Sequence, residues 1–234
     1  MSPATKEPFR SENADGRSSL SDYGTGSELL SLCSVAKSFG ATKIVDGATL
    51  SLRGGRALFL AGPSGVGKST LLEIAAGLIK PDAGSVRLRG KVSLLFQDDA
   101  LIPWLTASAN VAYVLPPAVP APEAEKLAEE QLRLFDLDPQ IFPSAMSGGM
   151  RRRLSLARTL AVKRPILLLD EPFAFLDARW RSVIASLIVA RVDDGDGVIV
   201  TGHETPSLLA EALGERLDTI AVTRQPISFV FPAD

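Results

Sequence analysis

Runs of apolar residues, separated by glycine-rich and polar turns, divide the chain into alternating strands and helices. Short strands are predicted at 29–35 and 48–52, and a third at 56–61 follows a pair of glycines. Residues 85–90 alternate apolar and polar side chains, which is typical of an antiparallel strand, and a turn is predicted just before them at 81–84. This order of elements predicts an α/β fold.

Three further strands complete the predicted sheet, at 92–96, 166–169 and 198–201. The four consecutive apolar residues at 166–169 are typical of a strand that is buried on both faces, as in a parallel sheet. Apolar residues from Leu71 to Leu78 predict a helix after the strand at 56–61. We therefore expect a mixed sheet, with an antiparallel part beside the buried parallel strands.

A mostly helical lobe is predicted between the strands 92–96 and 166–169. The proline-rich stretch 115–122 excludes regular helix or central strand, and apolar residues recur at helical spacing between Ala124 and Phe135. A second helix is expected at about 148–162. The lobe, about 107–162, is therefore predicted as an insertion into one domain that covers 28–234.

The bulk composition limits the class of protein. A chain of 234 residues with 46% hydrophobic residues can form one large α/β domain with a small inserted lobe. A net charge of −2 indicates no basic footprint, so we expect no nucleic-acid partner. The single cysteine, Cys33, excludes an intramolecular disulfide and is predicted to be a small buried apolar residue.

The first residues, 1–27, are rich in serine, glycine and charged residues and contain no apolar core of a secretory signal. We expect them to form a disordered tail. No apolar stretch approaches the ~20 residues that span a bilayer. The sequence therefore predicts a cytoplasmic protein that reaches a membrane only by docking onto another subunit.

A phosphate-binding loop is predicted where the strand at 56–61 meets the following helix. The sequence there reads G-x-x-x-x-G-K-S, in which glycines let several backbone N–H groups point at one phosphate and the helix start adds its positive end. Lys68 is expected to neutralise the β- and γ-phosphates, and the Ser69 hydroxyl to bind Mg²⁺. The alternative is a glycine-rich turn at a helix start. The predicted nucleotide-binding residues of this loop are Gly62, Pro63, Ser64, Gly65, Val66, Gly67, Lys68, Ser69 and Thr70.

Two adjacent carboxylates, Asp170 and Glu171, end the predicted buried strand 166–169. Downstream of a phosphate-binding loop, Asp170 is predicted to hold Mg²⁺ and Glu171 to orient the attacking water and accept its proton. The alternative is a solvated helix start, where acidic residues favour the helix dipole.

The stretch Met146-Ser147-Gly148-Gly149-Met150, with the arginine-rich helix after it, resembles the LSGGQ signature of the ATP-binding cassette (ABC) ATPases. This resemblance covers about residues 29–217 and implies a P-loop NTPase fold of the ABC type. It also implies that Ser147, Gly148 and Gly149 bind the nucleotide held by a second copy, so that a homodimer sandwiches two ATP molecules with Mg²⁺. Taken alone, Ser-Gly-Gly is a turn and a helix N-cap.

The resemblance assigns three further residues. Gln97 matches the Q-loop glutamine that reaches Mg²⁺ and the attacking water, and His203 matches the H-loop histidine that contacts the γ-phosphate. Phe39 matches the aromatic residue that stacks on adenine. A surface or core position is the alternative for His203, and an apolar core position is the alternative for Phe39. The segment 175–177 matches the D-loop of the dimer seam.

The sequence departs from the family pattern at Met146, Met150 and Gly202, where the family commonly has Leu, Gln and Thr. Gly202, directly before His203, is expected to change the local geometry around that histidine but not the fold. The run 151–153 of three arginines suits either a nucleic-acid patch or a solvated or interface-facing helix surface, and we favour the second.

The stretch 96–106 resembles the nitrate, sulfonate and taurine importer branch of the family. This implies an ATPase subunit that energises import of a small anion and is bound at the cytoplasmic face of a bacterial inner membrane to integral permease subunits, with a substrate-binding protein as an indirect partner. Trp104 is expected to receive the permease, or alternatively to pack the lobe onto the sheet. Other functions to weigh are a soluble ABC ATPase of a non-transport assembly and a P-loop small-molecule kinase.

Overall fold

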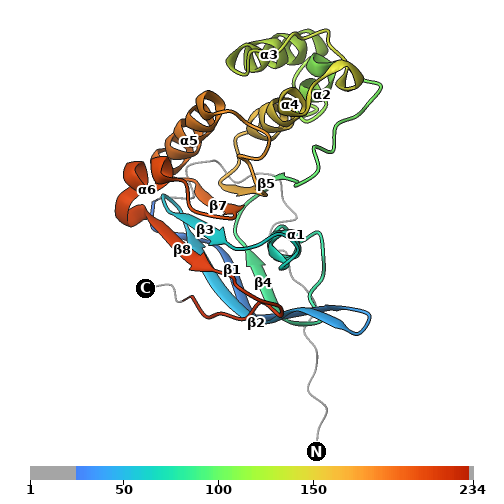
Figure 1. Ribbon diagram of the computed structural model, residues 1–234. Coiled ribbons are helices and arrows are strands. Elements are labelled where there is room, and N and C mark those ends of the chain that lie inside the picture. The colour runs from blue at the N-terminus through green and yellow to red at the C-terminus, as the bar shows by residue number, and fades with distance from the viewer. Residues whose placement is uncertain (1–24, 232–234) are drawn as a thin grey trace, which may run out of the picture.

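The computed structural model describes residues 25–231, so the predicted tail 1–27 lies outside the described residues except for its last three (Figure 1). The strands form two sheets. Five parallel strands follow the order β5-β6-β7-β3-β8, and three antiparallel strands follow the order β2-β1-β4. The predicted α/β fold is confirmed, with the two strand directions in separate sheets. The parallel strands are β3 (Ala57–Ala61), β5 (Val92–Leu95), β6 (Ile166–Leu169), β7 (Gly197–Gly202) and β8 (Leu217–Ala221).

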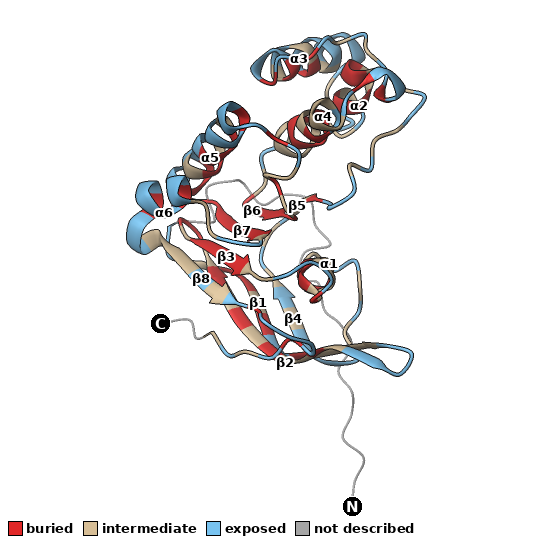
Figure 2. Cartoon of the chain, in the orientation of Figure 1, coloured by how far each residue is buried: buried red, intermediate tan, exposed pale blue. Residues whose placement is uncertain are grey.

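The parallel sheet has an apolar layer on each face. Along β6, Leu167 and Leu169 face one hydrophobic cluster and Ile166 and Leu168 face the other, so all four side chains are buried. Figure 2 shows the buried residues concentrated in β3, β6 and β7. The continuous apolar run was the sequence signal for this arrangement.

The antiparallel sheet and α1 cover one face of the parallel sheet, and the remaining helices cover the other. Strands β1 (Glu28–Phe39) and β2 (Thr42–Arg53) are longer than the sequence pattern predicted. Strand β4 (Ala83–Leu88) begins inside the predicted turn 81–84. A Cβ on Gly84, whose φ is +81°, would lie 2.4 Å from the Ser34 carbonyl oxygen, so only glycine lets β4 approach β1 there.

Cys33 is exposed, so the prediction of a buried apolar cysteine was wrong. The pairing of β1 with β4 changes register between Cys33 and Ala36, and Ser34 in between has a φ of +49°. This bulge interrupts the alternation of inward and outward side chains, and two consecutive residues become exposed.

The helices of the lobe gather at the top of Figure 1: α2 (Ala107–Ala112), α3 (Ala121–Leu134) and α4 (Gly148–Leu160). Helix α3 includes Pro122, which the prediction had placed in an irregular segment. Proline is accepted there because the first turn of a helix needs no internal N–H donor.

Helix α1 (Lys68–Ala75) ends before Leu78, which is exposed, because Gly77 adopts a φ of +76° that stops the helix. The other helical segments in residues 25–231 are α5 (Ala178–Asp193), α6 (Ser207–Leu213) and the short 3₁₀ turns η2 (Pro143–Ala145) and η3 (Gly214–Arg216). Within residues 25–231, no helix has the length and apolar character needed to cross a membrane.

Phe135 ties the lobe to α5, because its fully buried ring stacks on Trp180 with a centroid separation of 6.3 Å. We expect Phe135→Ala to lower the free energy of unfolding by about 3–5 kcal/mol, since it removes a buried aromatic ring. The neighbouring Leu134, 63% exposed, is the control, and Leu134→Ala should change it by less than about 0.5 kcal/mol. Urea denaturation measures both. Equal effects of the two substitutions would contradict this role of Phe135.

Candidate nucleotide-binding and hydrolysis site

The predicted site residues follow four neighbouring strands of the parallel sheet. Lys68 comes after β3, Asp170 after β6, His203 after β7 and Gln97 after β5. The carboxyl ends of parallel strands lie at one edge of a sheet, which is where ligands bind in open α/β folds. The topology therefore brings these residues, distant in sequence, to one edge.

The loop 62–67 is fixed by close backbone contacts. The Gly62 N–H donates to the Gly202 carbonyl at 2.9 Å, and a Cβ on Gly62 would lie 2.1 Å from the Val222 carbonyl oxygen. Gly65 and Gly67 have φ values of +77° and +111°, in the region that favours glycine. The pattern of glycines is thus required by the folded loop. Helix α1 starts at Gly67 without a side-chain cap among the described residues, which leaves its first N–H groups for an anion.

Lys68 lies beneath this loop, with only 4% of its surface exposed. Its Nζ donates to the carbonyls of Gly62 and Pro63, each at 2.8 Å, and is 3.8 Å from Glu171 Oε1. Burial lowers the pKa of the Lys68 ammonium, and the carboxylates of Glu171 and Asp170 oppose that shift. The loop, the lysine and the acidic strand end therefore form one connected group.

Thr201, which the sequence analysis did not single out, connects the Asp170 carboxylate to the Glu171 backbone. Its Oγ1 donates to Asp170 Oδ1 at 2.5 Å and accepts the Glu171 N–H at 3.0 Å. Glu171 has a φ of +49°, which costs a non-glycine residue about 1–2 kcal/mol. The threonine is the last buried residue of β7, directly beside β6. Its position at the end of a buried strand was the available signal.

The oxygen donors at the β5 end fit a magnesium ion. Ser69 Oγ donates to Gln97 Oε1 at 3.3 Å, and both residues line a cavity of about 340 Å³ together with Asp170. Hydroxyl, amide and carboxylate oxygens are ligands that Mg²⁺ accepts, while phosphates and water complete its octahedron. Within residues 25–231, no group of three histidine, cysteine or acidic side chains forms a metal cage. The site therefore suits a metal that arrives with phosphate.

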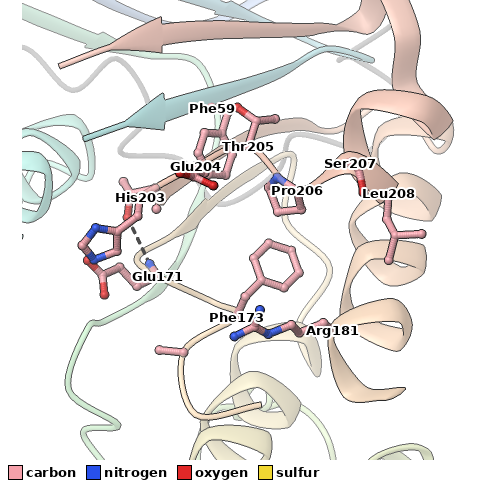
Figure 3. Close-up of a pocket in the computed structure, with 13 residues that line it drawn as sticks. Phe59, Glu171, Phe173, Arg181, His203, Glu204, Thr205, Pro206, Ser207 and Leu208 are labelled. Carbon is pink, nitrogen blue, oxygen red and sulfur yellow. Dashed lines mark hydrogen bonds between the residues drawn. The ribbon is translucent and has the colours of Figure 1, made fainter. Parts of the chain in front are cut away.

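A second cavity, of about 640 Å³, opens beside Glu171 and His203 (Figure 3). The His203 ring is exposed, so the core alternative for this residue was wrong, and its Nε2 lies 3.3 Å from Ser64 Oγ in the phosphate-binding loop. Phe173 and Arg181 line the same cavity, and Figure 3 labels them together with Glu171 and His203 around it. A histidine in this position can reach a group bound by the loop.

The predicted signature residues lie elsewhere. Ser147 caps α4, since its hydroxyl accepts the Met150 N–H at 3.2 Å, as the N-cap interpretation requires. A Cβ on Gly149 would lie 3.1 Å from the Phe175 carbonyl oxygen. Of the described residues, those lining the cavities beside Gln97 and His203 do not include any of 147–149. The start of α4 therefore lies outside these two cavities.

The three consecutive arginines do not share one surface, so the prediction of a solvated or interface-facing run was wrong for the buried Arg152. Arg151 is exposed. Arg152 is 1% exposed and donates to main-chain carbonyls of the site. Arg153 lies over the Trp180 ring, 4.5 Å from its centroid. Consecutive helical residues point about 100° apart, so a run of like charges cannot occupy one face.

Phe39 and Trp104 are both exposed, at 51% and 75%. The core alternative for Phe39 and the packing alternative for Trp104 were therefore wrong. Phe39 sits at the turn between β1 and β2, with Lys37 Nζ 5.6 Å from its ring centroid. Both rings are free to contact another molecule.

The family is shown by comparison. The family model described as "ABC transporter" matches residues 45–174, and this chain belongs to that family. It is the ATP-hydrolysing class of subunit, as the sequence predicted, with the P-loop fold of that class. The chain is 40% identical over 166 residues to a protein of Chlorella vulgaris named as a probable sulfate/thiosulfate import ATP-binding protein, covering 65% of this chain and 70% of that protein.

Two further similarities are informative. The aliphatic sulfonates import ATP-binding protein SsuB of Corynebacterium glutamicum is 36% identical over 181 residues, covering 75% of this chain and 74% of that protein. The dimeric structure of MJ0796, titled a bacterial ABC transporter cassette, superposes with a TM-score of 0.74 at 28% identity, covering 88% of this chain and all of that one.

Removal of the Thr201 hydroxyl tests the geometry at the strand ends. We expect Thr201→Val to lower the free energy of unfolding by about 1–3 kcal/mol, because buried partners on Asp170 and Glu171 lose their hydrogen bonds. Thr205, whose hydroxyl lies 3.3 Å from that of Thr219 near the surface, is the matched control. Thr205→Val should change the value by less than about 0.5 kcal/mol. If urea denaturation gave the same free energy of unfolding for Thr201→Val as for the parent chain, the connecting role of Thr201 would be refuted.

Proposed function

We propose that this chain binds and hydrolyses ATP to energise a membrane importer, with two copies closing on two MgATP. The observation that carries this is the position of Lys68, Asp170, Glu171 and His203 at one sheet edge. ATP-binding import proteins among the relatives support the same function.

The phosphate-binding loop and its lysine hold the triphosphate. In this proposal the N–H groups of 62–70 surround the β-phosphate, and Lys68 exchanges one of its carbonyl partners for phosphate oxygens. Ser69, Gln97 and Asp170 hold Mg²⁺, which neutralises phosphate charge when bound. The exposed ring of Phe39 stacks on adenine.

Hydrolysis is an in-line attack of water on the γ-phosphorus. Glu171 accepts the proton of that water, the bond from the γ-phosphorus to the bridging oxygen breaks, and ADP and phosphate leave. His203 donates a hydrogen bond to the γ-phosphate, while Gln97 orients the water. The backbone of Glu171 is held through Thr201, so its carboxylate needs little reorganisation.

The second copy supplies the other half of the site. Ser147, Gly148 and Gly149 form a helix start that lies outside the two cavities described above, and helix starts bind anions. A homodimer places these residues against the nucleotide of the other copy. The dimeric cassette of similar fold supports this arrangement.

Membrane permease subunits dock on the lobe at Trp104, where an exposed indole is flanked by the half-buried Leu101, Ile102 and Leu105. This places the chain on the cytoplasmic face of a membrane, with a substrate-binding protein as an indirect partner. Relatives of comparable identity are named for sulfate, Fe(3+) and sulfonate import. These names do not separate the substrates, and in this proposal the resemblance of the 96–106 stretch favours a small anion such as nitrate, a sulfonate or taurine.

Glu171 is tested by removing only its charge. We expect Glu171→Gln to retain ATP binding within about 2-fold and to lower kcat by about 100-fold or more, because the water loses its proton acceptor. Glu211, exposed on α6, supplies the control, and Glu211→Gln should hydrolyse normally. Phosphate release and equilibrium nucleotide binding are the measurements. Steady-state hydrolysis at the parent rate in Glu171→Gln would rule out the assignment.

Trp104 is tested by capture of membrane partners. Trp104→Ala should abolish co-purification of integral membrane chains from detergent extracts, since a central aromatic anchor contributes about 2 kcal/mol or more, while hydrolysis by the isolated chain continues. Val230→Ala, an equally exposed apolar truncation, should capture them normally. Equal capture by both variants would exclude the proposed docking site, and capture of a soluble assembly instead would favour the non-transport alternative.

A further inference from the structure

Arg152 is a buried charged residue that binds two segments of the site at once. Its Nη1 donates to the carbonyls of Phe96 at 2.8 Å and Gln97 at 3.3 Å. Its Nη2 donates to the carbonyl of Asp170 and, at 2.8 Å, to that of Glu171. The planar fork of a guanidinium can serve two such pairs of acceptors, which a lysine ammonium cannot.

These four carbonyls are the groups that the sheet leaves without partners. Strands β5 and β6 pair in parallel up to Leu95 and Leu169, and the Asp170 N–H still donates to the Leu95 carbonyl at 3.0 Å. Beyond that point the segments that follow β5 and β6 no longer pair as strands. The guanidinium bridges the two segments where the ladder ends and supplies donors to their carbonyls.

The same arginine holds one side of the strained Glu171 backbone. The N–H of Glu171 is bound by Thr201, and its carbonyl accepts from Arg152 and from the Ala174 N–H at 3.1 Å. Contacts on both sides of the residue maintain its φ of +49°. The direction of the Glu171 side chain therefore depends on a residue of α4.

Helix α4 also donates hydrogen bonds to the rest of the segment around Gln97, residues 96–100, which is the Q-loop. Ser155 Oγ donates to the Asp99 carbonyl at 2.9 Å, and Arg158 donates to the carbonyls of Asp99 and Ala100 at 3.1 and 2.7 Å. Residues 152, 155 and 158 recur every three positions on one helix face. The helix that starts at Ser147 is thus attached to both 96–100 and 170–171.

The burial of Arg152 indicates more than a stabilising role. Burial lowers the pKa of its guanidinium, and the carboxylates of Asp99 and Asp170 oppose that shift. Its Nε is buried without a partner among the described residues. Buried charges of this kind are weak contributors to stability and better suited to fixing one geometry.

We propose that Arg152 is a positioning residue that fixes the Glu171 backbone and the Gln97 loop to the signature helix, so that the three move as one body. This rests on the proposed function, in which Glu171 and Gln97 act on the ATP of one copy and Ser147 binds that of the other. Arg152 then links the two nucleotide sites of the dimer through a chain of direct hydrogen bonds.

The test compares Arg152→Gln with Arg153→Gln. Arg153 lies next on the same helix and also donates to two carbonyls, those of Phe135 and Asp136 at 2.5 and 3.0 Å, but these belong to the lobe. In the nucleotide-free protein, Arg152→Gln should accelerate amide hydrogen exchange at Asp170, Glu171 and Ala174 by about 10-fold or more. Arg153→Gln should leave these amides at the parent rate.

Kinetics supply the second readout. Arg152→Gln should lower kcat by about 10-fold or more while KM for MgATP stays within about 2-fold, because binding groups remain and only the reacting geometry is loosened. Arg153→Gln should retain the parent kcat. If Arg152→Gln does not fold, Arg152→Lys is the second variant and should show the same losses, since it keeps the charge but not the fork.

The inference would be overturned if a folded Arg152 variant kept the amide exchange rates and the kcat of the parent chain. It would also be overturned if Arg153→Gln changed these rates and kcat as much as the Arg152 variant does. If either of these results is obtained and the parent chain hydrolyses ATP, only the role of Arg152 is refuted and the proposed function stands. A parent chain that does not hydrolyse ATP refutes the proposed function instead, and the exchange measurement still decides the role of Arg152.

Discussion

The edge where the parallel strands end is the constraint on which the site depends. Inside the sheet, N–H and C=O groups of neighbouring strands satisfy one another. Beyond Leu95 and Leu169, the N–H and C=O groups of β5 and β6 no longer pair with one another, and those that are buried need other hydrogen-bond partners. Thr201 and Arg152 supply these partners through side chains. The same hydrogen bonds that satisfy the strand ends also fix the Asp170 carboxylate and the Glu171 backbone, so stability and the geometry needed for the proposed reaction have one physical origin.

Each chain contains an incomplete site with respect to the proposed reaction. Lys68, Glu171 and His203 surround one position for a triphosphate, while Ser147 lies at a separate helix start. Closure of two copies places the second group on the first. Hydrolysis removes the γ-phosphate that both copies bind, so the closed state loses its main attraction. In the proposed function, a cycle of closing and opening of this kind would move permease subunits docked near Trp104.

The sequence predicted the fold where strong patterns existed. The apolar run of β6 and the glycine pattern of the phosphate-binding loop each have one structural solution, and both were found. Spacing did not reveal the length of β1 or the bulge that exposes Cys33, because these depend on pairing with distant segments. The helical position of Pro122 was missed because proline is accepted in the first turn of a helix. The sequence pattern did not predict the burial of Arg152 either, since its hydrogen-bond partners are in the segments that follow β5 and β6. The assigned roles of all the predicted site residues, Lys68, Asp170, Glu171 and His203 as well as Phe39, Gln97 and Ser147, stay predictions.

The central claim is that triphosphate is held between Lys68 of one copy and Ser147 of the other. The most direct test uses a Cys33→Ser background, which removes the only native cysteine. Chains that carry Ser64→Cys are mixed with chains that carry Ser147→Cys, and a short bis-maleimide is added. Covalent mixed dimers should form when ATP is present under conditions that block hydrolysis, and not without nucleotide. Bound ATP without any such mixed dimer would contradict the claim.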